Sequence, residues 1–265
     1  MARVLAVANQ KGGVAKTATV HSLGAALAEL GERVLIVDLD PQACLTFSVG
    51  IDPDTVARSL HDVFMRRVPI VDVVEHLAER LDIVPATIDL AGSEIFLLTR
   101  TGREHVLARA LEPLSDAYDT VLVDCPPSLG VLTINGLTAA DAVLVPMQCD
   151  TLSHRGVGQL LETIDDVRSF ANPRLGVRGI IPTMFDGRTR HARETLEGVR
   201  SRYSMPVFDP PVPKSVRFAE APAHGRSILA HAPRSAAAEA YRTHARALHA
   251  ERQHPVEENA RAALA

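Results

Sequence analysis

The chain has 265 residues, of which 46% are hydrophobic, and carries a formal net charge of −4. This length suits one α/β domain, and the hydrophobic content supports a sizeable buried core. No apolar run is long enough to span a membrane, and no charged-then-apolar segment opens the chain, so neither a spanning helix nor a secretory signal is expected. The three cysteines form no C-x-x-C pair, which predicts buried free thiols in a reducing cytoplasm.

Short apolar, β-branched runs alternate with helical patterns along the chain. The predicted strands are residues 4–8, 33–38, 81–85, 120–124, 142–147 and 177–184. The predicted helices are residues 17–30, 93–115, 129–139, 153–170, 190–203 and 236–252. Near-continuous apolar strands separated by helices predict a doubly wound, mainly parallel sheet with helices on both faces, in a single domain over residues 1–252.

The remaining segments have weaker patterns. Residues 52–77 are expected to form short helices over one edge of the sheet. Residues 209–231, rich in Pro and Ala, are expected to be a loop with one short helix. Residues 253–265 end in small residues and are expected to form a flexible tail.

A glycine loop between the first strand and the first helix carries the strongest chemical signal. The chain has only three lysines among its 28 basic residues, and two of them, Lys11 and Lys16, bracket this loop. Random placement would give this result roughly once in 100, by counting over the basic residues. An ammonium fits between phosphate oxygens where a planar guanidinium does not. Strand, glycine loop and helix together predict a phosphate-binding site.

Each residue of the loop has an expected role. Gly12 and Gly13 supply a permissive backbone, and the N–H groups from there to Thr17 converge on a β-phosphate. Lys16 neutralises the β/γ oxygens, and the Thr17 hydroxyl ligates Mg²⁺. The cofactors expected are therefore ATP or ADP and Mg²⁺. The full set of loop residues in this prediction is Lys11, Gly12, Gly13, Val14, Ala15, Lys16, Thr17 and Ala18.

Aspartates end two of the other predicted strands. Asp38 and Asp40 follow the second strand and share one face by alternation, and Asp124 ends the strand 120–124. Ligands of open α/β sheets bind at the carboxyl ends of the strands. A strand-end aspartate is often only a helix cap, but three of them beside a phosphate loop favour a Mg²⁺ site.

These motifs resemble those of the ParA/MinD class of deviant Walker A P-loop ATPases, and among them the Soj-like chromosome-partitioning proteins. The string K-G-G-x-x-K-T carries the additional lysine, although Ala15 and Ala18 depart from the usual family string. D-L-D-P-Q at 38–42 resembles the first switch region, and D-C-P-P-S-L-G at 124–130 resembles the second. With further matching stretches, the resemblance covers most of residues 2–250.

The resemblance implies a catalytic cycle. It assigns Asp40 to positioning the attacking water, Asp38 to supporting the Mg²⁺ shell and Asp124 to holding the ion. Lys11 of each protomer reaches the phosphates of the other in an ATP-dependent homodimer, so the catalytic residues are Lys11, Lys16 and Asp40. The adenine is placed against Pro213 and Ser215, with Thr183 and Met184 on its other side.

The resemblance also implies partners. The dimer is expected to bind double-stranded DNA without sequence preference, and a ParB-like protein is expected to stimulate its hydrolysis, in a cytoplasmic, nucleoid-associated protein. Basic residues exceed acidic ones by 14 to 7 between Arg174 and Arg252, a weak sign of an anionic partner. The expected DNA contacts are Arg188, Lys214 and Arg217, with Arg242 and Arg246 as weaker candidates.

Four other functions share parts of the pattern. A membrane-recruited MinD-like ATPase needs a basic amphipathic carboxyl-terminal helix, which residues 253–265 do not provide, and an orphan cargo-positioning ATPase is kept as an alternative beside it. An iron–sulphur reductase needs interface cysteines, and Cys125 lies in a string common to the whole family. A small-molecule ligase or kinase shares the scaffold. An ATP-binding switch with little turnover is suggested by Ala15 and Ala18.

Overall fold

The computed structural model describes residues 1–149, 153–203 and 205–253, and its centre is a seven-stranded sheet in the order β3-β4-β2-β5-β1-β6-β7. Every neighbouring pair is parallel except β3 and β4. The doubly wound, mainly parallel sheet predicted from the sequence is thus confirmed. The strands are β1 (Arg3–Val7), β2 (Val34–Asp38), β3 (Glu75–Ala78), β4 (Leu81–Val84), β5 (Thr120–Asp124), β6 (Ala142–Gln148) and β7 (Gly176–Thr183).

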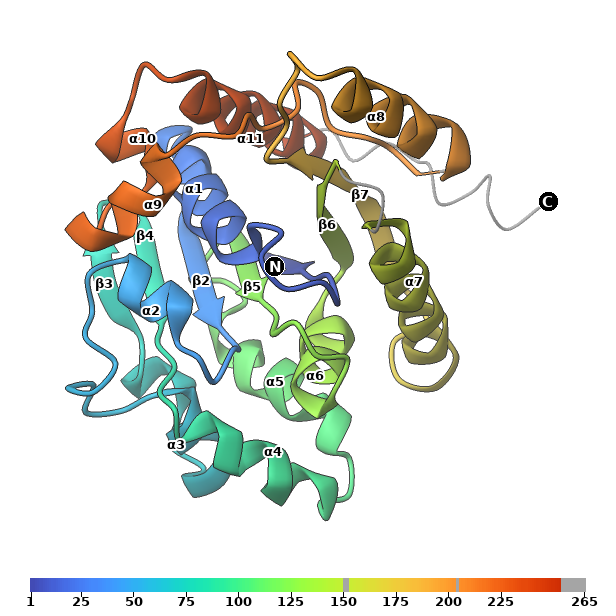
Figure 1. Cartoon of the computed structure of the whole chain (residues 1–265). Coiled ribbons are helices and arrows are strands. Elements are labelled where there is room, and N and C mark those ends of the chain that lie inside the picture. Colours follow the sequence, from blue (N-terminus) through green and yellow to red (C-terminus); the bar gives the residue numbers. More distant parts are fainter. Residues whose placement is uncertain (150–152, 204, 254–265) are drawn as a thin grey trace.

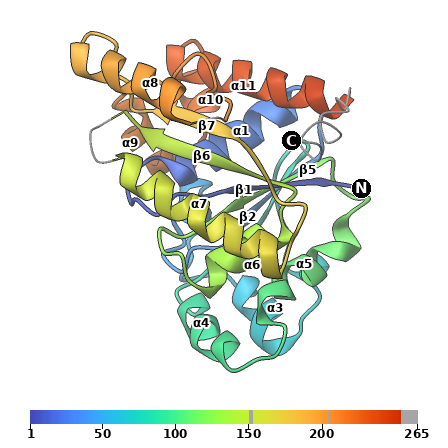
Figure 2. The same ribbon diagram turned by 90° about the vertical axis from the view of Figure 1, so that its right-hand side faces the viewer.

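Helices cover both faces of this sheet, as Figures 1 and 2 show. One face is covered by α1, α10 and α11, and the other by the helices from α3 to α7. The helices are α1 (Lys16–Glu29), α2 (Cys44–Ser48), α3 (Leu60–Arg66), α4 (Leu90–Leu98), α5 (Val106–Leu111), α6 (Val131–Ala139), α7 (Ser153–Phe170), α8 (Arg190–Arg202), α9 (Arg217–Glu220), α10 (Ile228–His231) and α11 (Ala236–Gln253).

The alternation of side chains along each strand produces two cores. In β1, Leu5 and Val7 pack under α1 and α11, whereas Ala6 packs in the core on the opposite face. All three are at most 1% exposed. Burial on both faces is the reason that the strands are apolar throughout and lack a polar alternation.

Two predicted elements differ from the structure. Residues 75–77, expected to close a run of short helices, belong instead to strand β3, which pairs antiparallel with β4 through a turn at Arg80 (φ 64°). The helix expected over residues 93–115 is split: α4 ends at Leu98, the chain turns through Gly102 (φ 67°), and the helical path resumes at Arg103 and leads into α5. β3 is a short, mostly exposed and charged edge strand, so it lacks the apolar signal of the others.

The carboxyl-terminal helix is fastened to the amino ends of the strands by buried polar contacts. Glu32, 2% exposed, accepts a hydrogen bond from the Thr120 hydroxyl at 2.6 Å and lies 2.7 Å from His249 Nδ1. The Arg3 guanidinium donates to the Leu248 carbonyl at 2.7 Å. Helix α11 continues through Gln253, one residue into the predicted tail, and residues 254–265 of that tail lie outside the described residues.

Two glycines hold the end of α2 against the segment before α10. A Cβ built on Gly225 would lie 2.7 Å from the Gly50 Cα, and both residues have positive φ, 93° at Gly50 and 60° at Gly225. No side chain fits between backbones that approach so closely. The pair therefore joins the segment after α2 to the segment 213–225, and both segments border the site described below.

We predict that Gly225→Ala lowers the free energy of unfolding by about 2–4 kcal/mol, because the left-handed backbone and the contact with Gly50 both disfavour a Cβ. Gly31→Ala is the matched control: Gly31 has φ 90° but nothing within 4 Å of its Cβ position. That variant should lose only about 1 kcal/mol. Urea unfolding followed by circular dichroism measures both, and equal losses would show that the contact is not tight.

Candidate functional site

The loop between β1 and α1 has the conformation of an anion-binding cradle. Gly13 (φ 72°) and Ala15 (φ 68°) are both left-handed, and Ala15 is the residue that caps α1. Lys16, 7% exposed, turns back so that its Nζ donates to the Lys11 carbonyl at 3.2 Å. The loop thus wraps around its own lysine and presents backbone N–H groups at the start of a 14-residue helix.

A cavity of about 820 Å³ opens at this loop. Most of the residues predicted to bind or act on the nucleotide line it, although they come from four separate parts of the chain. They are Gly12, Gly13, Ala15, Lys16, Thr17, Ala18, Asp40, Thr183, Met184, Pro213 and Ser215. Val14 is fully buried behind the loop, where its carbonyl accepts a hydrogen bond from the Thr183 hydroxyl at 3.0 Å.

Asp38 and Asp124 are register partners on β2 and β5, and both carboxyl groups are buried. Burial raises the pKa of Asp124 well above its usual value, and the neighbouring Asp38 raises it further, whereas Thr17 and Lys16 oppose the rise. Burial likewise raises the pKa of Asp38 to about 6. Burial lowers the pKa of the Lys16 ammonium, and Asp124 works against this change. The ionisation of Asp124 is therefore coupled to that of Asp38 and to that of Lys16.

The two aspartates differ in their hydrogen bonds. Asp38 Oδ2 accepts from the Thr46 N–H at 2.8 Å and from the Thr46 hydroxyl at 2.7 Å, and Oδ1 accepts from the Asp40 N–H at 3.2 Å. The Thr46 hydroxyl in turn accepts from the Ala86 N–H at 2.9 Å. Asp38 therefore organises the first switch loop and the start of α2, and its role in the Mg²⁺ shell stays a prediction.

Asp124 has the character of an ion ligand. No hydrogen bond of normal geometry reaches either of its buried carboxylate oxygens from the described residues, although the Thr17 hydroxyl is close enough to lower the pKa of this carboxyl. A buried carboxylate without a partner is costly, and a divalent cation removes that cost. The Thr17 hydroxyl comes from the adjacent start of α1, so Asp124 and Thr17 fit a Mg²⁺ ion held together with phosphate oxygens.

Asp40 borders the cavity on the side of the first switch region. Its Oδ1 accepts the Gln42 N–H at 2.9 Å, which fixes the turn after β2. The side chain is partly exposed, so it is within reach of solvent in a way that Asp38 is not. This position suits a carboxylate that orients a water molecule beside a phosphate.

The opposite wall of the cavity is formed by the end of β7 and the segment that follows α8. The Phe185 N–H donates to the Val212 carbonyl and the Lys214 N–H to the Phe185 carbonyl, both at 3.0 Å. These bonds hold Pro213 beside Met184, whose backbone is left-handed at φ 51°. The sequence patterns alone contain no signal for this pairing, and only the family resemblance brought the two segments together.

Further residues line the cavity that the sequence reasoning missed. His21 lies one turn beyond the loop, and Phe47 and Phe218 add aromatic surface from α2 and α9. Tyr241 reaches in from α11, and its hydroxyl lies 2.9 Å from the Thr19 hydroxyl. The helical position of His21 is visible in the sequence, but the contributions of α9 and α11 depend on tertiary packing. Aromatic side chains around a phosphate loop suit a planar base.

Three of the predicted DNA contacts lie near this wall. The bond from the Lys214 N–H to the Phe185 carbonyl brings Lys214 next to the turn that carries Arg188. Arg188 is exposed and bonds Asp186 at 2.9 Å, and Arg217 pairs with Glu220 at 3.0 Å. Exposed pairs of this kind contribute little to stability and exchange readily with other anions. The assignment of these three residues to DNA stays a prediction.

The two weaker candidates lie elsewhere, on α11. Arg242 binds both carboxylate oxygens of Glu29, at 2.7 and 3.1 Å, and Arg246 lies 2.6 Å from Glu239. Glu29 is the last residue of α1, and a helix of this length separates it by about 20 Å from the phosphate end. Their DNA role also stays a prediction, but they are not at the wall that carries Lys214.

The cysteines only partly match the expectation of buried thiols. Cys125 and Cys149 are buried, whereas Cys44 at the start of α2 is exposed and lines the cavity. No cluster of three or more His, Cys, Asp or Glu side chains able to hold a metal occurs within the described part of the chain. In that same part, no helix is long and apolar enough to cross a bilayer.

We predict that Ala15→Gly raises the free energy of unfolding of the nucleotide-free chain by about 0.5–1 kcal/mol, because glycine removes the left-handed strain. Gly13→Ala is the reciprocal control. It has the same backbone conformation and open space around its Cβ position, so it should lose about 1 kcal/mol. Urea unfolding without nucleotide measures both, and a destabilised Ala15→Gly variant would contradict the assigned strain.

Comparison with known proteins agrees with this site. The family model described as AAA domain matches residues 2–177. The chain is 43% identical to the sporulation initiation inhibitor protein Soj of Bacillus subtilis (strain 168), over 91% of this chain and 96% of Soj. It is 44% identical to the chromosome partitioning protein ParA of Caulobacter vibrioides, over 90% of this chain and 91% of ParA.

A solved structure extends the comparison to three dimensions. A Mycobacterium smegmatis protein named cobyrinic acid a,c-diamide synthase, crystallised with ADP and magnesium, is 51% identical and superposes with a TM-score of 0.86 over 96% of this chain and 97% of that one. Sequence identity over nearly the whole length, the phosphate loop and the two switch strings all lead to one conclusion. The chain belongs to the ParA/Soj family of deviant Walker A P-loop ATPases.

Proposed function

We propose that this chain is an ATP-hydrolysing, dimerising switch that binds DNA without sequence preference and partitions a chromosome, plasmid or other cellular cargo. The observation that carries the proposal is the single cavity at which Lys16, Thr17 and Asp40 meet the base-binding segment around Pro213. Soj and the Caulobacter ParA, which share 43–44% of its residues, support the partitioning role. The M. smegmatis structures with ADP or an ATP analogue and magnesium support the cofactors.

The proposed reaction uses this chain's own groups in defined roles. Backbone N–H groups of the loop and the Lys16 ammonium bind the β- and γ-phosphates. Thr17 and Asp124 hold Mg²⁺, which neutralises the phosphate charge. Asp40 orients the attacking water. Lys11 lies at the outer end of the loop, and in the proposed dimer it enters the partner's site and stabilises transition-state charge as an arginine finger does.

In the proposed switch, dimerisation controls the affinity for DNA. Two protomers double the basic surface that carries Arg188, Lys214 and Arg217, so DNA affinity rises when ATP holds the dimer together. A ParB-like partner would stimulate hydrolysis and so release DNA. The protein is then cytoplasmic and associates with the nucleoid.

A second candidate function is suggested by the M. smegmatis protein, whose name is that of a cobyrinic acid a,c-diamide synthase. An enzyme of that name forms amides from carboxyl groups of its acid substrate. ADP formation measured with cobyrinic acid and an ammonia donor, and separately with duplex DNA, distinguishes the two. Turnover that depends on the acid would favour the synthase.

We predict that Lys16→Ala weakens ADP binding at least about tenfold, because the charge-assisted hydrogen bonds to the phosphates are lost. Lys16→Arg should also bind weakly, since a guanidinium does not fit within the loop around the Lys11 carbonyl. Isothermal titration calorimetry gives the affinities.

The matched control is Lys11→Ala, which removes the other lysine of the same loop. It should keep ADP affinity within about threefold and lose the ATP-dependent dimer detected by light scattering, because its proposed target is the partner's phosphate. Normal ADP affinity in Lys16→Ala would overturn the assignment of the phosphate site.

We predict that the chain with ATP binds two unrelated duplexes of equal length about equally, and that with ADP it binds both far more weakly. Affinity should fall steeply with salt, because the contacts are to phosphates. Fluorescence anisotropy at two salt concentrations measures this dependence. Wild-type protein with ATP that shows no DNA affinity at low salt would contradict the proposal.

A charge-reversal pair tests where DNA binds. Lys214→Glu and Arg217→Glu should weaken binding to both duplexes alike and lower the salt slope by about 1 per lost contact. Arg174→Glu changes the net charge by the same amount, but Arg174 is an exposed residue before β7, remote from the cavity residues. Binding by this control should stay close to that of the wild type, and equal losses in all three would indicate only a net-charge effect.

A further inference from the structure

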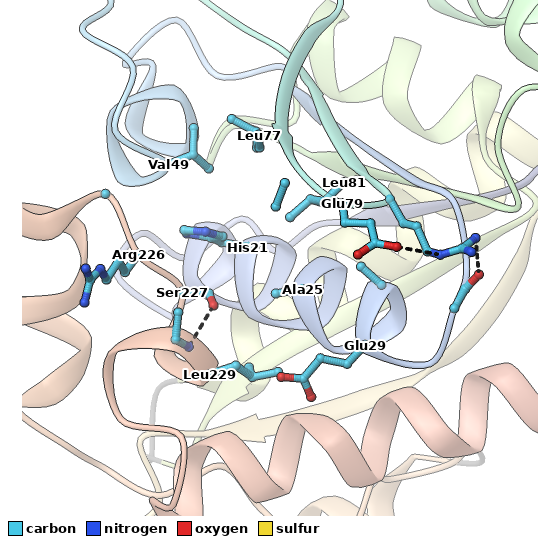
Figure 3. Close-up of a pocket in the computed structure, with 16 residues that line it drawn as sticks. His21, Ala25, Glu29, Val49, Leu77, Glu79, Leu81, Arg226, Ser227 and Leu229 are labelled. Carbon is cyan, nitrogen blue, oxygen red and sulfur yellow. Dashed lines mark hydrogen bonds and ion pairs between the residues drawn. The ribbon is translucent and has the colours of Figure 1, made fainter.

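A second hollow, of about 570 Å³, lies along α1 from His21 to Glu29, beyond the phosphate loop at the start of that helix. Figure 3 shows it between α1, the β3–β4 hairpin and the segment that leads into α10. It shares only His21, Arg226 and Ser227 with the nucleotide cavity. Its volume is within the range of small-molecule sites.

The lining of the hollow is mixed, and apolar surface makes up somewhat more than half of it. Ala25 of α1, Val49 after α2, Leu77 of β3 and Leu229 of α10 all pack at the edge of the core beneath α1 and α11. An opening of this kind in a core exposes apolar surface, which a ligand with an apolar body removes from water.

The charged groups at the far end of the hollow are already paired. Glu29 binds Arg242 at 2.7 Å, and Glu79 lies 3.9 Å from Arg80. The Arg80 guanidinium also donates to the Gly31 carbonyl at 3.2 Å. Because these pairs satisfy one another, this end of the hollow does not call for a charged ligand, and the exposed Arg226 guanidinium at the other end is directed away from His21 and Ala25 (Figure 3).

His21 supplies one directed polar atom. The Ser48 hydroxyl donates to the Leu45 carbonyl at 2.8 Å, so only its lone pairs remain for His21 Nδ1, which is 3.3 Å away. On this basis we assign the proton to Nδ1, which makes Nε2 the acceptor. Nothing among the described residues bonds Nε2. The ring is only 8% exposed and lies on the side of α1 that faces Val49 and Leu77 (Figure 3).

We propose that this hollow binds a small, uncharged, mainly apolar molecule that has one N–H or O–H donor, of the indole or phenol class, with the donor directed to His21 Nε2. The ring stays neutral at physiological pH, because burial lowers the pKa of His21 to about 4, so it acts there as an acceptor. The site does not depend on the proposed partitioning function, since it contains none of the phosphate-binding residues.

The test is a pair of probes that differ in one hydrogen-bond donor. Indole and 1-methylindole are titrated into isotopically labelled wild-type chain with excess Mg-ADP, which keeps them out of the nucleotide cavity. NMR shifts at His21, Ala25 and Leu77 are expected with indole, and 1-methylindole should bind about tenfold more weakly because it leaves Nε2 unpaired. Equal affinities, no binding at millimolar indole, or shifts confined to Phe47 and Phe218 would overturn the proposal.

Variants then locate the site. Ala25→Leu fills the hollow from α1 and Leu77→Trp fills it from the hairpin, so each should abolish indole binding even if the other fails to fold. His21→Val should make the two probes bind equally. Phe170→Leu, an exposed change remote from the hollow, is the control and should bind as the wild type does. A lack of ADP-induced shifts at Gly12 would count against the proposed function. The indole titration would still show whether the hollow binds the probe.

Discussion

Two buried carboxyl groups, at the carboxyl ends of neighbouring strands, determine how the structure beside the phosphate loop is built. Asp38 and Asp124 are register partners, and the charge of Asp38 makes ionisation of Asp124 less favourable. Because the folded pKa of Asp38 lies above its unfolded value, its ionisation reduces stability as the pH rises from about 4 to about 6. Hydrogen bonds from Thr46 and from the Asp40 N–H favour the charged form of Asp38, and the nearby Lys16 ammonium favours the charged form of Asp124.

Asp38 and Asp124 differ in what they contact. Asp38 joins β2 to α2 and, through Thr46, to the end of β4, so that the first switch region rests on the sheet. The buried oxygens of Asp124 lack a hydrogen bond of normal geometry, and we propose that they bind an ion. A cation bound there would relieve the like-charge repulsion, which makes ion binding and the position of the switch loop parts of one equilibrium.

The sequence predicted the parts of this site that depend on local chemistry. The loop from Lys11 to Thr17 and the strand-end aspartates were visible because glycines, lysines and carboxylates occur there at fixed positions beside apolar runs. The strand β3 was missed because an exposed edge strand needs no apolar alternation. The break at Gly102 was missed because helical periodicity continues on both sides of it.

Other features were beyond any local pattern. The contact of Pro213 with the end of β7 joins residues about 30 positions apart through backbone hydrogen bonds, which leave no mark on residue type. The bare nitrogen of His21 depends on which way the Ser48 hydroxyl points. Such properties arise from packing between elements, and a family resemblance supplies them only where relatives share the same residues.

The approach of Gly50 to Gly225 limits how segments can be exchanged between relatives. A chimaera that takes residues 213–225 from another family member brings in a new residue at one side of the contact, and the host supplies the other. If either side carries a Cβ, the two backbones must move apart, and the segment after α2 shifts relative to the cavity wall around Pro213. Segment swaps intended to change nucleotide or partner preference therefore need both positions to be transferred together.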